Sequence, residues 1–223
     1  MTDSGTLWLD NDSFDLVATL LSRGAAGDGV HYALANALTY VIDGVASQEL
    51  LELLLQHNAD VNFDDGKSLQ LATHYARQDL FELLLQRNPK PHSLYMCLKA
   101  ALNNGHDEET VFRLFESVTK NEFVHEKPNV NNYSDLGLPL LFYSLNNYPA
   151  SARLTNEICQ LDANLSATID WDIYNGEYDG PVPDQISPLL LSLEKDCSDE
   201  VIDILLTHGG ECSNRLPPRL QIV

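Results

Sequence analysis

Basic side chains are scarce in this chain. Its 223 residues include 13 Lys and Arg against 33 Asp and Glu, which gives a formal net charge of −20. Nucleic acids are bound mainly through Lys and Arg side chains that neutralise phosphates, so the composition argues against a nucleic-acid partner. The same shortage argues against binding to an anionic membrane surface. We therefore expect no nucleic acid and no membrane among its partners.

Cysteines and long apolar segments are also few. The four cysteines, Cys97, Cys159, Cys197 and Cys212, lie too far apart for a disulfide-stapled domain, so we expect buried free thiols. No segment approaches the roughly 20 consecutive apolar residues that span a bilayer. The first five residues are acidic rather than basic and no apolar segment follows, so no secretory signal is expected. These absences predict a soluble intracellular protein, cytoplasmic or nuclear.

Apolar residues, by contrast, are plentiful. They make up 44% of the chain while charged residues make up 21%, so the chain can bury a core rather than remain disordered. At roughly 100–200 residues per domain, the length fits one large domain or two small ones.

Residues 66–88 show the clearest internal pattern. The apolar residues of 69–76 fall at helical spacing, and those of 80–84 do the same after a short polar break. Asn88 tolerates the left-handed conformation that ends many helices, and Pro89 cannot continue one. The segment therefore predicts a helix, a tight turn and a second helix.

The end of this second helix recurs along the chain. Its copies begin at Leu20, Leu54, Leu84, Leu114, Ile158 and Leu205. The successive spacings are 34, 30, 30, 44 and 47 residues. A period near 33 residues with helix–turn–helix content is that of ankyrin repeats.

The chain resembles the ankyrin-repeat family in specific motifs. Residues 53–62, LLLQHNADVN, look like the family's LLLxxGADVN, and residues 187–190, SPLL, resemble its TPLH start. Residues 69–72, LQLA, look like LHLA, and Ala76 falls where the family usually has a glycine between helices. The variant GKSLQLA at residues 66–72 is similar to arrays in large fungal ankyrin proteins.

This resemblance covers about residues 7–215 and implies an all-α solenoid. The whole chain, 1–223, would be a single domain of about six divergent repeats, with a monomer as the favoured state. The repeats are expected at approximately 7–29, 30–65, 66–92, 93–120, 138–168 and 185–214. Long loops are expected as insertions at 119–137 and 169–184, and in stacked helical hairpins such loops emerge along one edge.

The second insertion lies in the most acidic part of the chain. Residues 157–214 hold 13 acidic residues and one basic residue, Lys195. Aromatic side chains interleaved with carboxylates are typical of a protein-binding surface. Three readings stay open for the aromatic residues of 171–178: packing of the loop onto the stack, contact with a partner, or a small-molecule site.

Other candidates come from the repeat with the clearest pattern. His74 and Tyr75 end a first helix, where family members expose residues towards the concave face, and Arg77 follows at the turn. Residues 63–65 would form the tip of a loop, where a Phe either anchors a partner or folds back over the neighbouring loop. The candidate partner-binding residues are Phe63, Asp64, Asp65, His74, Tyr75, Arg77, Asp170, Trp171, Asp172, Tyr174, Glu177 and Tyr178.

Chemical motifs are weak by comparison. Residues 170–176 depart from a calcium-binding loop, because Tyr replaces a ligand and the Gly comes one residue late. His208, Cys212 and Cys197 lack zinc-site spacing, and the chain has no nucleophile elbow or phosphate-binding loop. We therefore expect no metal, no cofactor and no catalytic residue.

The sequence thus favours a non-catalytic interaction module, a scaffold or adaptor. Its concave edge and acidic C-terminal third would capture another protein with a basic surface patch. Two alternatives stay open: a specialised enzyme of cyclase or isomerase type with a pocket under the 170–184 loop, and a stoichiometric inhibitor or regulatory subunit.

Overall fold

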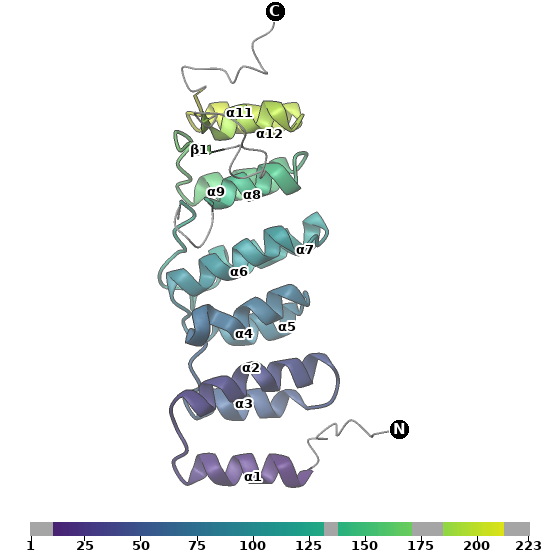
Figure 1. Cartoon of the computed structure of the whole chain (residues 1–223), viewed down its shortest axis with the longest axis vertical. Coiled ribbons are helices and arrows are strands. Elements are labelled where there is room, and N and C mark those ends of the chain that lie inside the picture. Colours follow the sequence, from purple (N-terminus) through teal and green to yellow (C-terminus); the bar gives the residue numbers. More distant parts are fainter. Residues whose placement is uncertain (1–10, 132–137, 171–184, 212–223) are drawn as a thin grey trace, which may run out of the picture. The chain divides into compact units, whose positions relative to one another are not determined.

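The computed structural model describes residues 11–131, 138–170 and 185–211, and over these it is overwhelmingly helical (Figure 1). This confirms the all-α prediction. The only sheet within the described ranges is an antiparallel ladder of two short strands. The elements are α1 (Asn11–Ser22), α2 (Asp28–Ile42), α3 (Gln48–Gln56), α4 (Phe63–His74), α5 (Gln78–Leu85), α6 (Pro91–Asn103), α7 (Glu108–Lys120), α8 (Leu140–Asn147), α9 (Ala152–Gln160), β1 (Ile169–Asp170), β2 (Gln185–Ile186), α11 (Pro188–Glu194) and α12 (Asp199–Thr207).

The chain forms two compact units. Unit 1 comprises Met1–Cys97 and Ser117–Glu126, and unit 2 comprises Leu98–Glu116 and Lys127–Val223. In unit 1, α2 pairs with α3, α4 pairs with α5, and α2 stacks on α4, while α1 contacts α3. The side chains that are fully buried between these helices include Leu34, Leu38, Leu51, Leu69, Leu80, Leu84, Phe81 and Ala72. Each hairpin has one apolar stripe, so stacking is what removes these side chains from water.

Unit 2 repeats this arrangement with its own elements. The hairpins α8–α9 and α11–α12 stack helix on helix, with α11 against α8 and α12 against α9. Ser187 and Pro188 begin α11: the Ser187 hydroxyl accepts a hydrogen bond from the Leu190 amide, and proline suits the first helical position. The motif at residues 187–190 therefore starts a helix, as predicted.

Most helices end in the same way. Two residues after the last helical residue, or three in the case of Asn88, the backbone turns left-handed, with φ between +49° and +92°. Glycine fills this position in some copies, and asparagine, aspartate or alanine fills it in others: Gly24, Gly44, Asn58, Ala76, Asn88, Gly105, Asp162, Asp196 and Gly209. Left-handed residues let the last carbonyls of a helix find donors, as when the Arg77 amide donates to the Ala72 carbonyl at 2.9 Å.

Ala76 occupies this turn at a conformational cost. Its φ is +52°, a region that burdens a residue with a Cβ by about 1–2 kcal/mol. We expect Ala76→Gly to raise the free energy of unfolding by about 0.5–1 kcal/mol, since part of the relief is offset by extra freedom in the unfolded chain. Urea denaturation measures this. Ala100→Gly, inside α6, is the control and should lower the free energy of unfolding by about 1 kcal/mol. If Ala76→Gly lowered it as well, Ala76 would not be strained.

Side-chain hydrogen bonds to backbone groups tie the loops to parts of the chain that are distant in sequence. In unit 1 the Asp60 amide donates to Nδ1 of His31 at 3.0 Å, and the Lys90 amide donates to Oδ1 of Asn62 at 2.6 Å. In unit 2 the Asn131 side chain bonds both the Asp162 carbonyl, at 2.7 Å, and the Asn164 amide, at 2.5 Å. These bonds join residues 28 to 33 positions apart: those of Asn62 and Asn131 link one loop to the next, and that of His31 links the first turn of α2 to the loop after α3.

The two predicted insertions are described in part. After α7 ends at Lys120, residues 121–131 form turns without helix or strand, in agreement with a loop. The second insertion is closed by the β-ladder, in which Ile169 pairs with Ile186 and both are buried. Among the described helices, none combines the length and apolar character needed to cross a membrane.

Candidate partner-binding site

Phe63 is half-buried against two rings from the preceding hairpin. Its ring centroid lies 4.7 Å from that of Tyr32, edge to face, and 5.3 Å from that of His31. Both partners lie in the first turns of α2, and α2 stacks on α4. Phe63 thus packs on α2 rather than over a neighbouring loop, and Tyr32 beside it is 56% exposed.

The two aspartates after Phe63 differ in their contacts. Asp64, Asp65 and Gly66 all have positive φ, so the backbone makes a left-handed turn before α4 continues. The Asp65 carboxylate meets Nε2 of His92 at 3.2 Å, while Asp64 is exposed. Gly66 is required here because a Cβ would lie 2.7 Å from Cβ of Ser93.

His74 and Tyr75 are both exposed at the end of α4. Their rings pack edge to face with centroids 4.9 Å apart, and Tyr75 is 47% exposed. Arg77 is instead engaged locally. Its guanidinium donates two hydrogen bonds to Asp79, at 2.9 and 2.7 Å, which lower the pKa of that carboxyl and raise the pKa of Arg77. Of these three candidates, the two aromatic side chains offer the more accessible surface.

The candidates of the second insertion are described only at its edge. Asp170 lies in β1, where it pairs with Gln185. Trp171, Asp172, Tyr174, Glu177 and Tyr178 lie outside the described residues. Their proposed contacts therefore stay predictions.

Exposed carboxylates are concentrated on the last helix of unit 2. Asp199, Glu200 and Asp203 on α12 are all exposed, and among the described residues none of the three forms an ion pair. At the turn before α12, Asp196 is exposed as well. Within the described ranges, no neighbouring cation neutralises the charge of these carboxylates, so they attract a basic surface.

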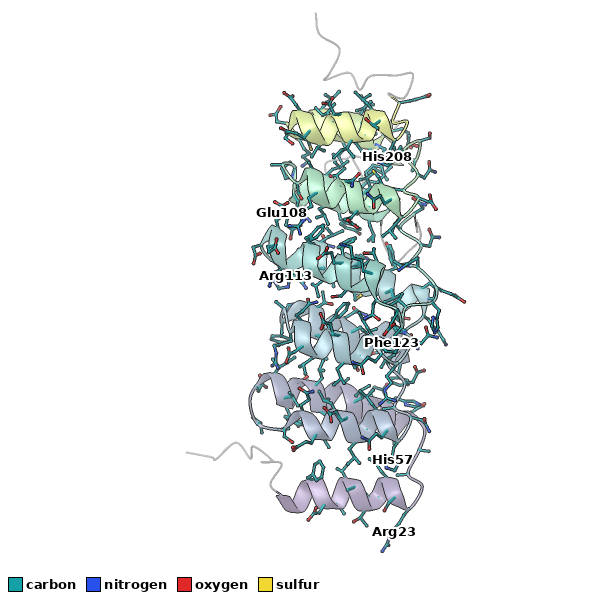
Figure 2. All side chains as sticks on the ribbon, turned by 180° about the vertical axis from the view of Figure 1, so that it is seen from behind. Arg23, His57, Glu108, Arg113, Phe123 and His208 are labelled. Carbon is teal, nitrogen blue, oxygen red and sulfur yellow. The ribbon has the colours of Figure 1, made fainter. Side chains whose placement is uncertain are left out.

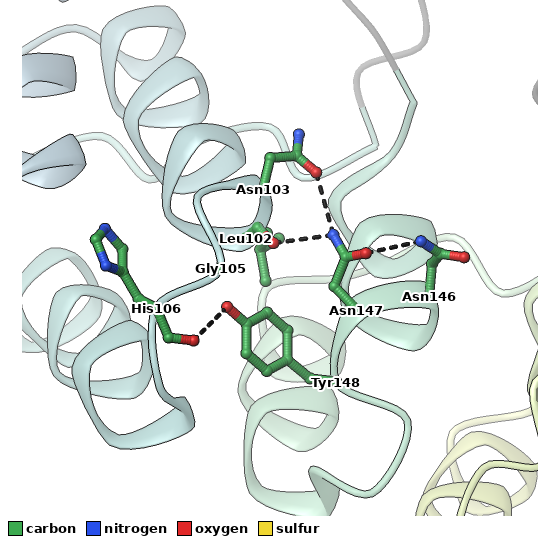
Figure 3. A pocket seen from close by; sticks show the side chains of 7 residues that line it. All are labelled: Leu102, Asn103, Gly105, His106, Asn146, Asn147 and Tyr148. Carbon is green, nitrogen blue, oxygen red and sulfur yellow. Dashed lines mark hydrogen bonds between the residues drawn. The ribbon is translucent and has the colours of Figure 1, made fainter.

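An open depression of about 430 Å³ lies in unit 2 at the turns that follow α6 and α8 (Figure 3). The Asn147 amide points into the wall and donates to the Leu102 carbonyl at 2.9 Å, and it accepts from Asn146 at 2.7 Å. The Tyr148 hydroxyl donates to the His106 carbonyl at 3.0 Å. Burial, with a smaller effect from the charge of Asp107, raises the pKa of Tyr148. The side chains of Asn146, Asn147 and Tyr148 in this depression thus donate to acceptors in its own wall, and burial favours the neutral form of the Tyr148 phenol.

The described thiols are protected from reaction. Cys97, Cys159 and Cys197 are free and buried, as predicted, while Cys212 lies outside the described residues. Burial raises the pKa of Cys159 to about 11, and burial together with the charge of Asp196 does the same for Cys197. Neutral thiols are poor nucleophiles and poor metal ligands at physiological pH.

His208, considered above as a zinc ligand, is exposed just after α12 (Figure 2). Within the part of the chain that the structure describes, no three His, Cys, Asp or Glu side chains gather in a way that would hold a metal ion.

Comparison with known proteins yields no relative: no family model, no curated protein and no solved structure matches the chain.

Sequence reasoning missed His31 and Tyr32, the two residues whose rings pack against Phe63. His31 and Tyr32 stand side by side in an otherwise small and apolar helix, DGVHYALANALTYVI, and that contrast was the available signal. Their partnership with Phe63 depends on the stacking of α2 on α4, because more than 30 residues separate them along the chain.

Proposed function

We propose that the chain is a divergent ankyrin-type repeat protein that acts, without catalysis, as a scaffold or adaptor for another protein. The partner carries a basic surface patch, and the two bind inside the cell. The stacked hairpins within each unit support the repeat assignment, together with the motifs at residues 53–62 and 187–190.

The observation that carries this proposal is the hydrogen bonding between successive loops. Asn62 and Asn131 each tie one loop to the next through backbone groups, and His31 ties the first turn of α2 to the loop after α3. A loop edge fixed in this way presents side chains with little conformational freedom left to lose, and rigid surfaces bind proteins at a lower entropic cost. The depression in unit 2 adds no support for an enzyme, since the Asn147 amide and the Tyr148 phenol donate to the Leu102 and His106 carbonyls of its own wall.

The charge of the surface indicates the class of partner. The unpaired carboxylates of α12 favour a basic protein, and association driven by such charges slows as salt screens them. The candidate residues outside the described ranges, Trp171 to Tyr178, belong to the same acidic segment and are proposed to contribute to this contact.

Affinity capture followed by titration of the purified partner tests the proposal. Proteins retained from native lysate at low salt are identified, and each is then titrated against the chain by calorimetry. We expect one-to-one binding that weakens at least about tenfold when Asp199→Asn, Glu200→Gln and Asp203→Asn are combined.

The matched control removes the same charge elsewhere. Asp43→Asn, Glu122→Gln and Glu126→Gln neutralise three exposed carboxylates of unit 1 and should weaken binding less than threefold. An equal loss in both triple variants would show attraction by net charge alone and would reject a specific surface on α12. Capture of no saturable partner would reject the adaptor role itself.

A further inference from the structure

The ring cluster of His31, Tyr32 and Phe63, here named the aromatic cluster, has an open side and a fixed geometry. Tyr32 is 56% exposed, and its edge-to-face contact with Phe63 leaves ring faces that the other rings do not cover. The Asp60 amide holds Nδ1 of His31 as an acceptor, so the imidazole is held in place with its proton on Nε2.

Carboxylates lie next to this cluster along the chain. Asp28 begins α2 one turn before Tyr32, and residues four apart are neighbours on a helix surface. Asp64 follows Phe63 directly and is exposed. Aromatic faces attract cations through their quadrupole, and an adjacent carboxylate adds charge and accepts hydrogen bonds.

The protein uses this same chemistry internally in unit 2. The guanidinium carbon of Arg153 lies 3.3 Å from the ring centroid of Phe112, and its Nη1 donates to Glu109 at 2.8 Å. A ring face and a carboxylate thus hold one arginine there. In unit 1, across the described residues, no Lys or Arg side chain lies over the rings of the aromatic cluster.

From this contrast we propose that the aromatic cluster, with Asp28 and Asp64, receives an arginine side chain of the partner protein. The guanidinium stacks on the exposed ring of Tyr32, which stands at 77° to the Phe63 ring, and donates to the two carboxylates, whose charge complements it. Arginine rather than lysine is the occupant because its planar, weakly hydrated group stacks on rings and pairs with carboxylates at two points. The inference rests on the proposed function in naming a protein as the source of the arginine.

A small-molecule titration tests the site without any partner. Nα-acetyl-arginine amide is added to the ¹⁵N-labelled chain and followed by NMR, with Nα-acetyl-citrulline amide as the neutral isostere. We expect saturating shifts confined to residues 28–34 and 60–66, with a dissociation constant in the millimolar range. Citrulline should bind at least about fivefold more weakly, because it lacks the charge.

Variants separate the aromatic contribution from general attraction. Tyr32→Leu keeps an apolar exposed side chain but removes the ring, and it should weaken arginine binding about fivefold. Asp28→Asn with Asp64→Asn should weaken it further. Tyr40→Leu is the matched control, because Tyr40 is also an exposed tyrosine of α2, at 39%, and lies outside the aromatic cluster; it should leave arginine binding unchanged.

The outcomes distinguish this site from the proposed function. Equal shifts with citrulline, shifts spread over all acidic segments, or no effect of Tyr32→Leu would overturn the arginine site. A partner captured through α12 alongside such a result would leave the adaptor role standing. Conversely, a saturable arginine site with no captured partner would uphold the site and reject the adaptor role.

Discussion

Substituting Gly66 by alanine should destabilise the chain by about 3 kcal/mol. Gly66 has a φ of +76°, where a residue with a Cβ is strained by about 1–2 kcal/mol. An added Cβ would also lie 2.7 Å from Cβ and 3.2 Å from Cα of Ser93. Ser93 is buried in the first turn of α6, so the start of that helix would have to move, at a further cost of about 1–3 kcal/mol.

Gly44 provides the matched comparison. Its φ is +72°, nearly the same, but an added Cβ would meet nothing within 4 Å. Gly44→Ala should therefore show only the conformational cost, about 1 kcal/mol. Chemical denaturation of both variants measures the difference. If the two substitutions cost the same, the close approach of Gly66 to Ser93 does not stabilise the fold.

Truncating Leu190 to alanine should open unit 2 while leaving unit 1 intact. Leu190 is fully buried in α11, and α11 packs on both α8 and α12. A Leu→Ala change at such a site costs about 3 kcal/mol, since it removes transfer energy and leaves a cavity. Hydrogen exchange should then show amide protection in α8, α9, α11 and α12 lowered by about a hundredfold, because in stacked repeats each hairpin depends on its neighbours.

Leu38→Ala makes the reciprocal test. Leu38 is fully buried in α2, which packs on α3 and α4 of unit 1. Protection should fall in α2 to α5 and remain in α8 to α12. Parallel losses in both units after either substitution would show that the chain opens as one cooperative body, as the single domain expected over residues 1–223 implies.

Local signals were sufficient for the helices and their ends. The apolar spacing of residues 69–84 placed the α4–α5 hairpin, and residues 187–190 placed the start of α11, because both depend on interactions within a few residues. Asn88 is left-handed, as expected after a helix, and Ala76, at the position where the ankyrin family usually has glycine, is left-handed too. The role predicted for Phe63 in binding a partner stays a prediction.

Tertiary structure decided which of these side chains act together. The aromatic cluster combines residues 31, 32 and 63, and Gly66 is constrained by Ser93, yet nothing in their local patterns links them. Arg77 pairs with Asp79 through two hydrogen bonds, a contact that the sequence reasoning did not include.

The positions of helices and turns and the overall acidity of this chain could be predicted from its sequence, because they depend on short segments and on composition. Contacts across repeats arise only when α2 stacks on α4, or α8 on α11, and bring residues about 30 to 50 positions apart into range. The entropy lost in closing such long loops is offset by the burial of many side chains together. No single sequence motif therefore predicts these contacts.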